Sequence, residues 1–557
     1  MSRLQNAVNR VKLALKRQVS GEAFSVLFHV VLLFVFVTIL RPLFSASIAA
    51  QEYEGVSIVV SVLQADVNSL IRGATRNQPV VPEVLFLFIP TLYFLFAKRR
   101  LRWTDWQHGT AFRALVMAIL AVVVWSGATF EYNNYLHRGH ALDRLLLLGL
   151  FGLSWRYPLA VPFAVRLGII LVREGYVPIN LDDFEFRTVT ELLTLFSIFI
   201  WLSAKRSFQP WHALIVGVGS WACYYYIAGV AKWTYGPKYS WLLENRLTNL
   251  ALSTHMRGWL ASVSDEHVNA VIRLIRPYDV LMSIYTLLVE FGALVAFFLH
   301  RKIARVWFGL CFLLHAGIFM MSGVFFWKWM LVNVAFIWWF GRRDARPILD
   351  KFFAYKLPLV LAAAAVFFSA NRIWYWPQTH VVWYDTPLLD QYDIIVVGKS
   401  GERYVVDPNY FAPQDLHMSQ GAFCYATDNE RAVTHIYGTT GSYEVMKQLN
   451  QFNDPKQALA LHNRGGVCSN PAQRLVFDNY MKRFFGNINR YGRPWDWLSR
   501  LGCPHHLWID VRGPKEFKAQ EKVTRLELWR TLRYAHKGKY HELEKKLAHT
   551  IELPDAN

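Results

Sequence analysis

The chain has 557 residues, of which 54% are hydrophobic, 16% aromatic and only 18% charged. Soluble domains carry about 25% charged residues, whereas apolar runs long enough to cross a bilayer recur along this chain, which excludes a soluble protein and a protein with a single anchor. The net charge of +20 is common in nucleic-acid-binding proteins. Here the basic residues lie at the N-terminus and in short turns, and no recognition module is present, so we expect contact with anionic membrane lipid and no nucleic-acid partner.

Residues 1–20 predict a basic amphipathic helix on the inner face of the membrane. They contain five basic residues and no acidic one, and their apolar residues fall at helical spacing. A cleaved signal peptide is the alternative interpretation. The apolar run Ala23–Leu40 is long for a signal core, however, and no convincing cleavage site follows it, so we interpret it as the first membrane span.

Residues 21–370 are expected to form a multi-span α-helical membrane domain. Further spans are predicted at Pro82–Phe96, Phe112–Phe130, Val189–Leu202, Ala213–Ala231, Val280–Phe298, Val306–Val324, Phe326–Phe340 and Leu357–Phe368. The segment Leu145–Val172 is interrupted by Arg156 and Pro158, among others. It can be one broken helix, a re-entrant hairpin or two short crossings.

Charged turns predict the orientation of these spans. Clusters of Lys and Arg at 98–100, 205–206, 300–302 and 342–343 are expected in the cytoplasm, together with the N-terminus, and the acidic loop at 174–185 outside. These assignments agree only if Leu145–Val172 crosses the membrane zero or two times. The tail after the last span is then on the non-cytoplasmic side.

Residues 371–557 have the composition of a soluble domain, which we expect to be α+β and extracytoplasmic. A β-hairpin is predicted over 394–408, with its turn at Gly398–Glu402, and helices at Pro455–His462 and Asn470–Phe484. The charged stretch Phe517–Leu553 predicts an exposed helix or a helical hairpin. Two of the three tail cysteines at 424, 468 and 503 can pair in an oxidising compartment, and which two stays open. The fold class is therefore mainly α, a polytopic membrane domain followed by a smaller α+β soluble domain.

Three ionisable residues in or beside apolar runs are candidate catalytic residues. Lys232 ends the run that begins near Ala213. In an apolar pocket a lysine can become a neutral amine that acts as a base, whereas at a helix end it can simply extend its ammonium to water. Glu290 and His315 lie inside apolar runs, where a charge requires a partner, and each can instead have only a packing role.

Metal binding is not predicted. His137 and His140 are three residues apart, but no third ligand is near them in the sequence. The pair His505–His506 is equally weak evidence, and the five cysteines show no metal-binding spacing.

The sequence Tyr-Ile-Ala-Gly-Val-Ala-Lys-Trp at 226–233, followed by Tyr235 and Trp241, resembles a known signature. It is similar to the segment around the active-site lysine of vitamin K-dependent gamma-carboxylases and of their bacterial relatives, the horizontally transferred transmembrane (HTTM) proteins. A second stretch resembles the same family, with Glu290 early in one apolar run and His315 embedded in the next. The resemblance covers roughly residues 211–340.

The resemblance implies a membrane carboxylase of the carbon–carbon lyase class. Lys232 would be the base that deprotonates a reduced quinone similar to vitamin K hydroquinone, with O2 and CO2 as co-substrates. Quinol epoxidation would then drive removal of a carbon-bound proton from a glutamyl acceptor and its carboxylation. His315 would donate a hydrogen bond to a developing quinone oxyanion, and Glu290 would assist. Tyr225, Tyr226 and Trp233 would surround the quinone ring, although aromatic residues also gather at membrane interfaces.

The resemblance further implies a bacterial inner-membrane protein that acts on a peptide or protein on the non-cytoplasmic side. The tail is shorter than the corresponding region of the animal enzymes and does not match it, so the acceptor stays open. Two alternatives remain: a membrane quinone oxidoreductase or peptide-maturation factor without carboxylation, and a non-enzymatic scaffold that displays the tail.

Overall fold

The structure is a computed structural model, which describes residues 20–44, 91–92, 95, 102–130, 135, 141–176, 183–203, 206–355, 382–411, 414–421, 423, 426, 430–433, 436–467, 469–493, 501–502, 505 and 512–554. Several predictions lie outside these residues. They concern the basic helix before Ser20, the span Leu357–Phe368, nearly all of the span Pro82–Phe96, the histidines at 137, 140 and 506, and the three tail cysteines.

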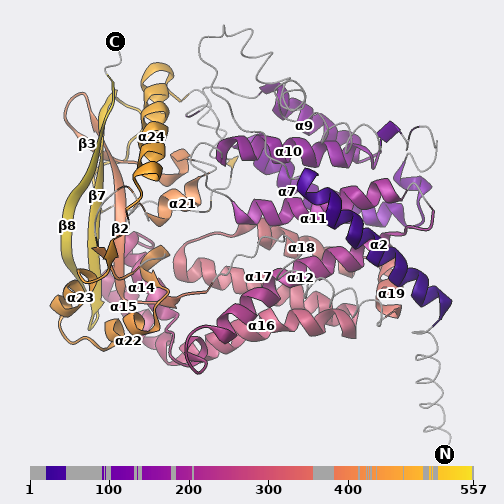
Figure 1. The fold of residues 1–557 in the computed structure, drawn as a ribbon, viewed down its shortest axis with the longest axis horizontal. Coiled ribbons are helices and arrows are strands. Elements are labelled where there is room, and N and C mark those ends of the chain that lie inside the picture. The colour runs from indigo at the N-terminus through magenta and orange to yellow at the C-terminus, as the bar shows by residue number, and fades with distance from the viewer. Residues whose placement is uncertain are drawn as a thin grey trace, which may run out of the picture.

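A bundle of long helices forms the larger part of the described chain (Figure 1). Its members are α2 (Gly21–Phe44), α7 (Gly109–Thr129), α9 (Ala141–Ser154), α10 (Ala160–Tyr176), α11 (Phe184–Leu202), α12 (Pro210–Thr234), α16 (Asp279–Leu299), α17 (Arg301–Ser322), α18 (Trp327–Gly341) and α19 (Arg346–Ala354). Four of the described helices are long and apolar enough to cross a membrane, with apolar segments Gly21–Leu40, Gly109–Thr129, Pro210–Thr234 and Arg301–Ser322. A helical membrane domain is consistent with this arrangement.

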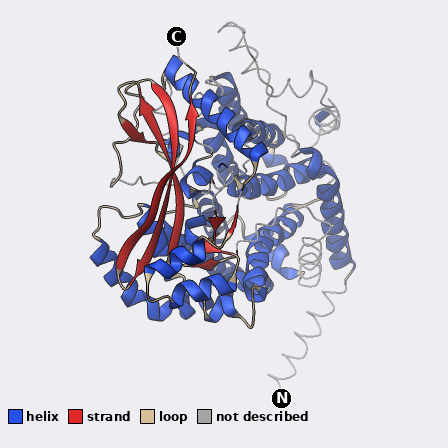
Figure 2. Cartoon of the chain, turned by 60° about the vertical axis from the view of Figure 1, so that its left-hand side comes forward, coloured by secondary structure: helices blue, strands red, loops and turns tan. Residues whose placement is uncertain are grey.

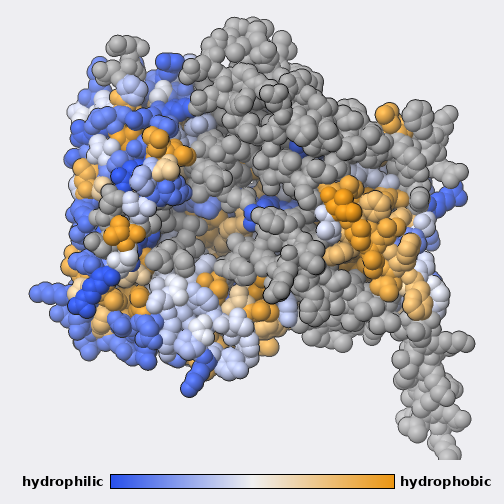
Figure 3. All heavy atoms as spheres, viewed as in Figure 1, coloured by the Kyte–Doolittle hydropathy of each residue, from blue (hydrophilic) through white to orange (hydrophobic). Residues whose placement is uncertain are grey.

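Apolar side chains also face outward on the bundle. Phe24, Phe28 and Ile39 of α2 are each about 60% exposed, and a hydrophobic surface lies at the right of Figure 3, where α2 runs in Figure 1. Hydrophilic side chains cover most of the described surface over the sheet, at the left of the same view. This contrast is expected where one part of a chain contacts lipid and the other contacts water.

The segment 145–172 folds as two helices, α9 and α10, joined by the short turn 155–159. The indole nitrogen of Trp103, before α7, donates to the carbonyl of Ser154 (2.7 Å), and Arg144 donates to the carbonyl of Ala128 at the other end of α7 (2.6 Å). Helices α7 and α9 are therefore antiparallel. The start of α9 and the end of α10 both lie beside the end of α7, where Leu147 and Leu171 approach Gly127.

The basic helix ends gather at the end of the bundle that is remote from the sheet (Figure 1). Arg305 lies against Gly341 at the end of α18, and Lys351 pairs with Glu22 at the start of α2 (2.7 Å). The indole of Trp339, also near the end of α18, donates to the carbonyl of Ala111 (2.7 Å). These contacts bring the N-terminus of α2 and the basic turns after α16 and α18 to one side.

The tail is built on a four-stranded antiparallel sheet with strand order β3-β2-β7-β8. Its strands are β2 (Leu388–Gly398), β3 (Arg403–Val405), β7 (Val523–His536) and β8 (Lys539–Glu552). Two short ladders pair β1 (Tyr384–Asp385) with β5 (Thr439–Thr440) and β4 (Glu430–Arg431) with β6 (Gly466–Val467). Figure 2 shows the long twisted strands at one side of the molecule, with the helices beside them.

Further helices complete the tail and its connection to the bundle. Those of the tail are α21 (Asp415–Gln420), α22 (Tyr443–Gln451), α23 (Pro455–His462) and α24 (Pro471–Tyr491). Between α12 and α16 lie α13 (Ser240–Leu243), α14 (Thr248–Arg257), α15 (Asp265–Ile275) and the 3-10 helix η4 (Arg276–Tyr278). The predicted hairpin is confirmed as β2 and β3, and the two predicted tail helices as α23 and the larger part of α24.

The prediction of a helix or helical hairpin over Phe517–Leu553 is wrong, because this segment forms the strands β7 and β8. Leu526, Leu528 and Leu532 are buried, at even spacings that place them on one face of β7. The high density of Lys and Glu in β8 suggested a solvated helix. On an exposed edge strand the same charges prevent pairing with other chains.

A buried ion pair joins the two central strands of the sheet. The guanidinium of Arg530 in β7 donates to both carboxylate oxygens of Asp390 in β2 (2.9 and 3.1 Å), and Arg431 donates to the same carboxylate (3.2 Å). All three side chains are at most 3% exposed. Removing one partner would leave uncompensated charge in the interior.

Asp390→Ala is therefore expected to lower the free energy of unfolding of the tail by about 3–5 kcal/mol. Asp350→Ala, which removes the exposed partner of Arg346, should cost less than about 1 kcal/mol. Denaturant unfolding of the purified full chain in detergent measures both values. Equal stability of the two variants would contradict a structural role for the buried pair.

Candidate functional site

Lys232 and Glu290 meet between α12 and α16. The ammonium nitrogen of Lys232 lies 2.5 Å from Oε1 of Glu290, and the two side chains are only 11% and 6% exposed. Lys232 stands in the last turn of its helix and Glu290 near the middle of the other. The lysine therefore points between the helices and does not extend to water.

Small residues on α12 allow this close contact. A β-carbon built on Gly229 would lie 3.0 Å from Cβ of Glu290, closer than nearly all such contacts, so glycine lets the two helices approach here. Above the pair, the ring of Trp241 in α13 has its centroid 5.6 Å from the ammonium of Lys232. The ring face adds a cation–π contact to the ion pair.

Glu290 has one carboxylate oxygen without a partner. Its Oε1 accepts from Lys232, whereas its Oε2 is buried and has no hydrogen bond to any residue that the structure describes. A buried polar atom of this kind is costly unless something else satisfies it. This oxygen is therefore able to accept a further hydrogen bond.

His315 has a defined tautomer when it is neutral. Its Nδ1 lies 2.8 Å from the carbonyl oxygen of Cys311, and because a carbonyl can only accept, Nδ1 carries the proton. The ring is 3% exposed, and among the described residues its Nε2 has no hydrogen-bond partner. Neutral His315 therefore presents a hydrogen-bond acceptor at Nε2, not the donor that the sequence analysis expects.

The three aromatic residues expected around a cofactor fall into two groups. The ring of Tyr225 packs edge-on against His315, with centroids 5.8 Å apart, and its hydroxyl accepts from Asn333 (2.8 Å). The rings of Tyr226 and Trp233 instead pack against Phe291, next to Glu290, at 5.9 and 6.2 Å. Tyr225 thus borders His315, while the other two border the ion pair.

A second buried cluster of charges was missed by the sequence analysis. Lys328 at the start of α18 lies 2.8 Å from Asp183 and 3.8 Å from Glu185, at the start of α11. His505 of the tail lies 2.9 Å from Glu185 and 3.1 Å from Asp415. A lysine within the apolar segment Phe325–Met330 was the signal that could have revealed this cluster.

The same cluster is the one place among the described residues where three metal-binding side chains converge. Ligand atoms of Asp183, Glu185 and His505 all lie within 4.8 Å of one another. The ammonium of Lys328 already stands among them, 3.0 Å from Nε2 of His505. Because this ammonium neutralises the carboxylates, we interpret the cluster as a charge link between bundle and tail.

Protonation of His505 is part of this link. Burial and the Lys328 ammonium lower the pKa of His505, but Asp415 and Asp183 outweigh both and raise it to about 10. For Asp183, burial raises the pKa, but Lys328 and His505 lower it well below its ordinary value. At neutral pH His505 is therefore protonated and Asp183 ionised, and the tail is held to the bundle by charge.

Comparison with models of protein families, with curated proteins and with solved structures finds no match to this chain. The functional assignment therefore rests on the residues and on their geometry.

The raised pKa of His505 predicts how stability depends on pH. Its protonation stabilises the folded chain fully below about pH 6.5, and this contribution is lost as pH rises through about 10. We expect His505→Asn to lower the melting temperature at neutral pH and to flatten its decline toward alkaline pH, as measured by thermal unfolding in detergent. His549→Asn, which alters a more exposed histidine paired with Asp478, should leave the decline unchanged. Parallel curves for wild type and His505→Asn would contradict the assignment.

Proposed function

We propose that this chain is an integral membrane enzyme of the vitamin K-dependent gamma-carboxylase type, in which oxygenation of a quinol drives carboxylation of an acceptor. The observation that carries the proposal is the buried Lys232–Glu290 pair, in which Oε2 of Glu290 lacks a partner among the described residues. The next helix, α17, carries a second acceptor without a described partner, Nε2 of His315. Both are hydrogen-bond acceptors when the carboxylate is ionised and the imidazole is neutral. They fit a ligand that offers hydroxyl groups, as a reduced quinone does.

Glu290 gives Lys232 a route to its neutral form. An ion pair in an apolar interior can pass a proton from ammonium to carboxylate, which leaves a neutral amine and a neutral acid with no net charge to desolvate. The amine can then take a proton from a quinol hydroxyl. A lysine held in this way can act as a base once its proton has passed to Glu290.

The surrounding side chains keep the site dry and orient its polar groups. The ring of Trp241 covers the ammonium of Lys232. Phe291, with Tyr226 and Trp233 packed against it, borders Glu290. His315 is held by its hydrogen bond to the helix backbone, so Nε2 is fixed in direction. The reduced quinone supplies, with O2, a base strong enough to remove a carbon-bound proton, to which CO2 then adds. The residues of the chain supply the first proton transfer, the orientation and the exclusion of water.

The orientation that we propose follows the positive-inside rule. The basic helix ends lie together at the end of the bundle remote from the sheet, which supports a cytoplasmic N-terminus and a tail on the other side of a bacterial inner membrane. Lys232 and Trp241 are then on the non-cytoplasmic side, where the acceptor would be a glutamyl side chain of a peptide or protein.

Lys232→Met is expected to lower quinol-dependent epoxide formation by about 10²–10⁴-fold, because it removes the base and keeps the apolar stem. Lys232→Arg should also be inactive, since a guanidinium stays protonated. Lys302→Met, at an exposed turn, is the matched control and should keep activity. The assay uses purified protein in detergent with reduced quinone, O2, labelled CO2 and a peptide that contains glutamate.

The outcomes separate the alternatives. Epoxide with label in the peptide supports the carboxylase, and epoxide without label supports a quinone oxidoreductase. Equal epoxide formation by wild type and Lys232→Met excludes Lys232 as the base, and no epoxide from folded wild type favours a scaffold.

Glu290→Gln is expected to make activity depend more strongly on pH. Without the carboxylate, Lys232 must lose its proton to water, so the rate should fall near neutral pH and recover partly as pH rises. The pH profile of epoxidation measures this effect. Glu191→Gln changes another buried glutamate, bonded to Tyr224 (3.1 Å), and should leave the profile unchanged. A uniform loss of rate at every pH in Glu290→Gln would show that Glu290 has only a packing role.

A further inference from the structure

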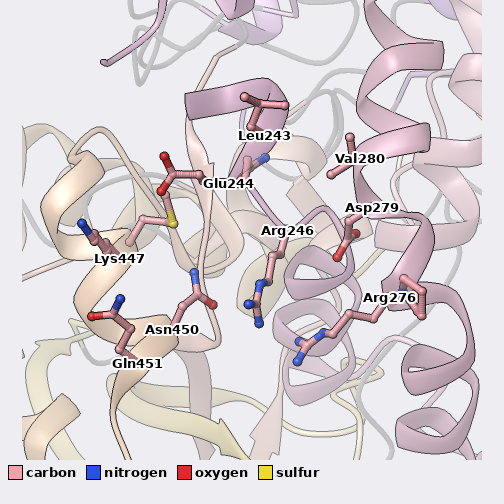
Figure 4. A pocket seen from close by; sticks show the side chains of 12 residues that line it. Leu243, Glu244, Arg246, Arg276, Asp279, Val280, Lys447, Asn450 and Gln451 are labelled. Carbon is pink, nitrogen blue, oxygen red and sulfur yellow. The ribbon is translucent and has the colours of Figure 1, made fainter. Parts of the chain in front are cut away.

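A cavity of about 410 Å³ lies where the tail meets the start of α16. Residues of three segments line it. The first segment is Leu243, at the end of α13, with Glu244, Asn245 and Arg246 after it. The others are Arg276, Pro277, Asp279 and Val280 around η4, and Met446, Lys447, Asn450 and Gln451 of α22. Figure 4 shows the guanidinium groups of Arg246 and Arg276 turned toward each other, with the amide of Asn450 beside them. The Lys232–Glu290 site uses none of these residues.

The donors of the cavity are held in place by a short relay of hydrogen bonds. Arg276 donates to Oδ1 of Asn249 (2.9 Å), and Asn249 donates from Nδ2 to Oδ1 of Asn450 (2.9 Å). The relay fixes the amide of Asn450, whose Nδ2 is buried and has no partner among the described residues. A buried N–H group directed at a cavity calls for an acceptor.

Basic side chains outnumber acidic ones in the lining of the cavity: Arg246, Arg276 and Lys447 against Glu244 and Asp279. The guanidinium of Arg246 has no ion pair or hydrogen bond with any described residue. The carboxylate of Asp279 is bonded to the backbone and hydroxyl of Thr248 (2.9 and 2.8 Å), and Glu244 accepts from Tyr443 (2.7 Å). Burial and the adjacent Arg246 lower the pKa of Arg276, and Asp279 offsets this only in part. An anion between the two guanidinium groups would relieve this repulsion.

An exposed apolar stripe begins at the edge of the cavity. Leu243 and Val280 line the cavity and are themselves exposed. From there Leu281, Ile284 and Leu288 follow along α16, all exposed and on one face of the helix. The site therefore offers donors for an anionic head group and, next to them, an apolar surface for hydrocarbon chains.

We infer that this cavity binds the phosphodiester head group of an anionic phospholipid, with the acyl chains along α16. The planar guanidinium of arginine can donate two hydrogen bonds to phosphate oxygens, and the side-chain amide of Asn450 adds a neutral donor. A small free anion would accept hydrogen bonds from the donors of the cavity but would leave the apolar stripe uncovered. An acidic peptide would likewise leave the apolar residues beside the cavity uncovered.

The test compares lipid binding by the full-length protein in a neutral detergent, by native mass spectrometry and by thermal unfolding. The probes are phosphatidylglycerol, phosphatidylcholine, inorganic phosphate and a glutamate-rich peptide. We expect wild type to prefer phosphatidylglycerol to phosphatidylcholine, and Arg246→Gln to bind phosphatidylglycerol about tenfold more weakly. Arg246 suits this test because its guanidinium has no bond within the described chain, so the variant should fold.

Arg273→Gln is the matched control, because this exposed arginine of α15 lies outside the cavity. It should bind phosphatidylglycerol as wild type does. Leu281→Ser should also weaken binding of the lipid. An equal loss of phosphatidylglycerol binding in Arg246→Gln and Arg273→Gln, or no loss of binding in Arg246→Gln, would overturn the inference. Protection by inorganic phosphate or by the peptide as strong as that by the lipid would overturn it too, since neither fills the apolar stripe.

Discussion

An ionised side chain inside an apolar interior is tolerated only with a partner, and this constraint organises the whole molecule. Lys232 and Glu290 satisfy this constraint by pairing between two helices of the bundle. Arg530 and Asp390 pair in the same way inside the tail. Lys328 is paired where the tail joins the bundle. In each case the partners come from segments far apart in the sequence. The helix or strand that carries one charge must therefore pack against the segment that carries its partner.

The connection between α12 and α16 is the part of the chain on which the proposed chemistry depends. Helix α13 brings Trp241 over Lys232, and Tyr384 at the start of the tail lies against it through a hydrogen bond to Ser240 (2.5 Å). The tail thus supports the short helix that covers the ion pair. A change in the tail can reach Lys232 through this contact, without a direct bond between the tail and the lysine.

Two of the places where the described tail contacts the bundle differ in their charges. The charge cluster around Lys328 ties α11 and α18 to His505, and the cavity with Arg246 and Arg276 lies between α22 and the start of α16. The first place is closed by pairing within the chain, since its charges satisfy one another. The second leaves donors unsatisfied and open beside an apolar surface. The two places differ in chemistry because basic side chains outnumber acidic ones only at the second.

The sequence by itself determined the helical class of the bundle, the positions of most of its described long helices and the main candidates Lys232, Glu290 and His315. These features depend on local composition: apolar runs of helical length, and rare ionisable residues within them. The hairpin over β2 and β3 was likewise local, because a glycine-containing turn lies between two β-branched runs.

Only the tertiary structure decided how these residues meet. Pairing across 58 residues placed Glu290 on Lys232, and a backbone hydrogen bond made Nε2 of His315 an acceptor. The strands β7 and β8 depended on β2, more than a hundred residues earlier, because a strand gains its hydrogen bonds from a neighbour and its own charges indicated a helix. The cluster around Lys328 needed His505 from the tail. Partners so distant in the sequence leave no local pattern, so packing alone revealed them.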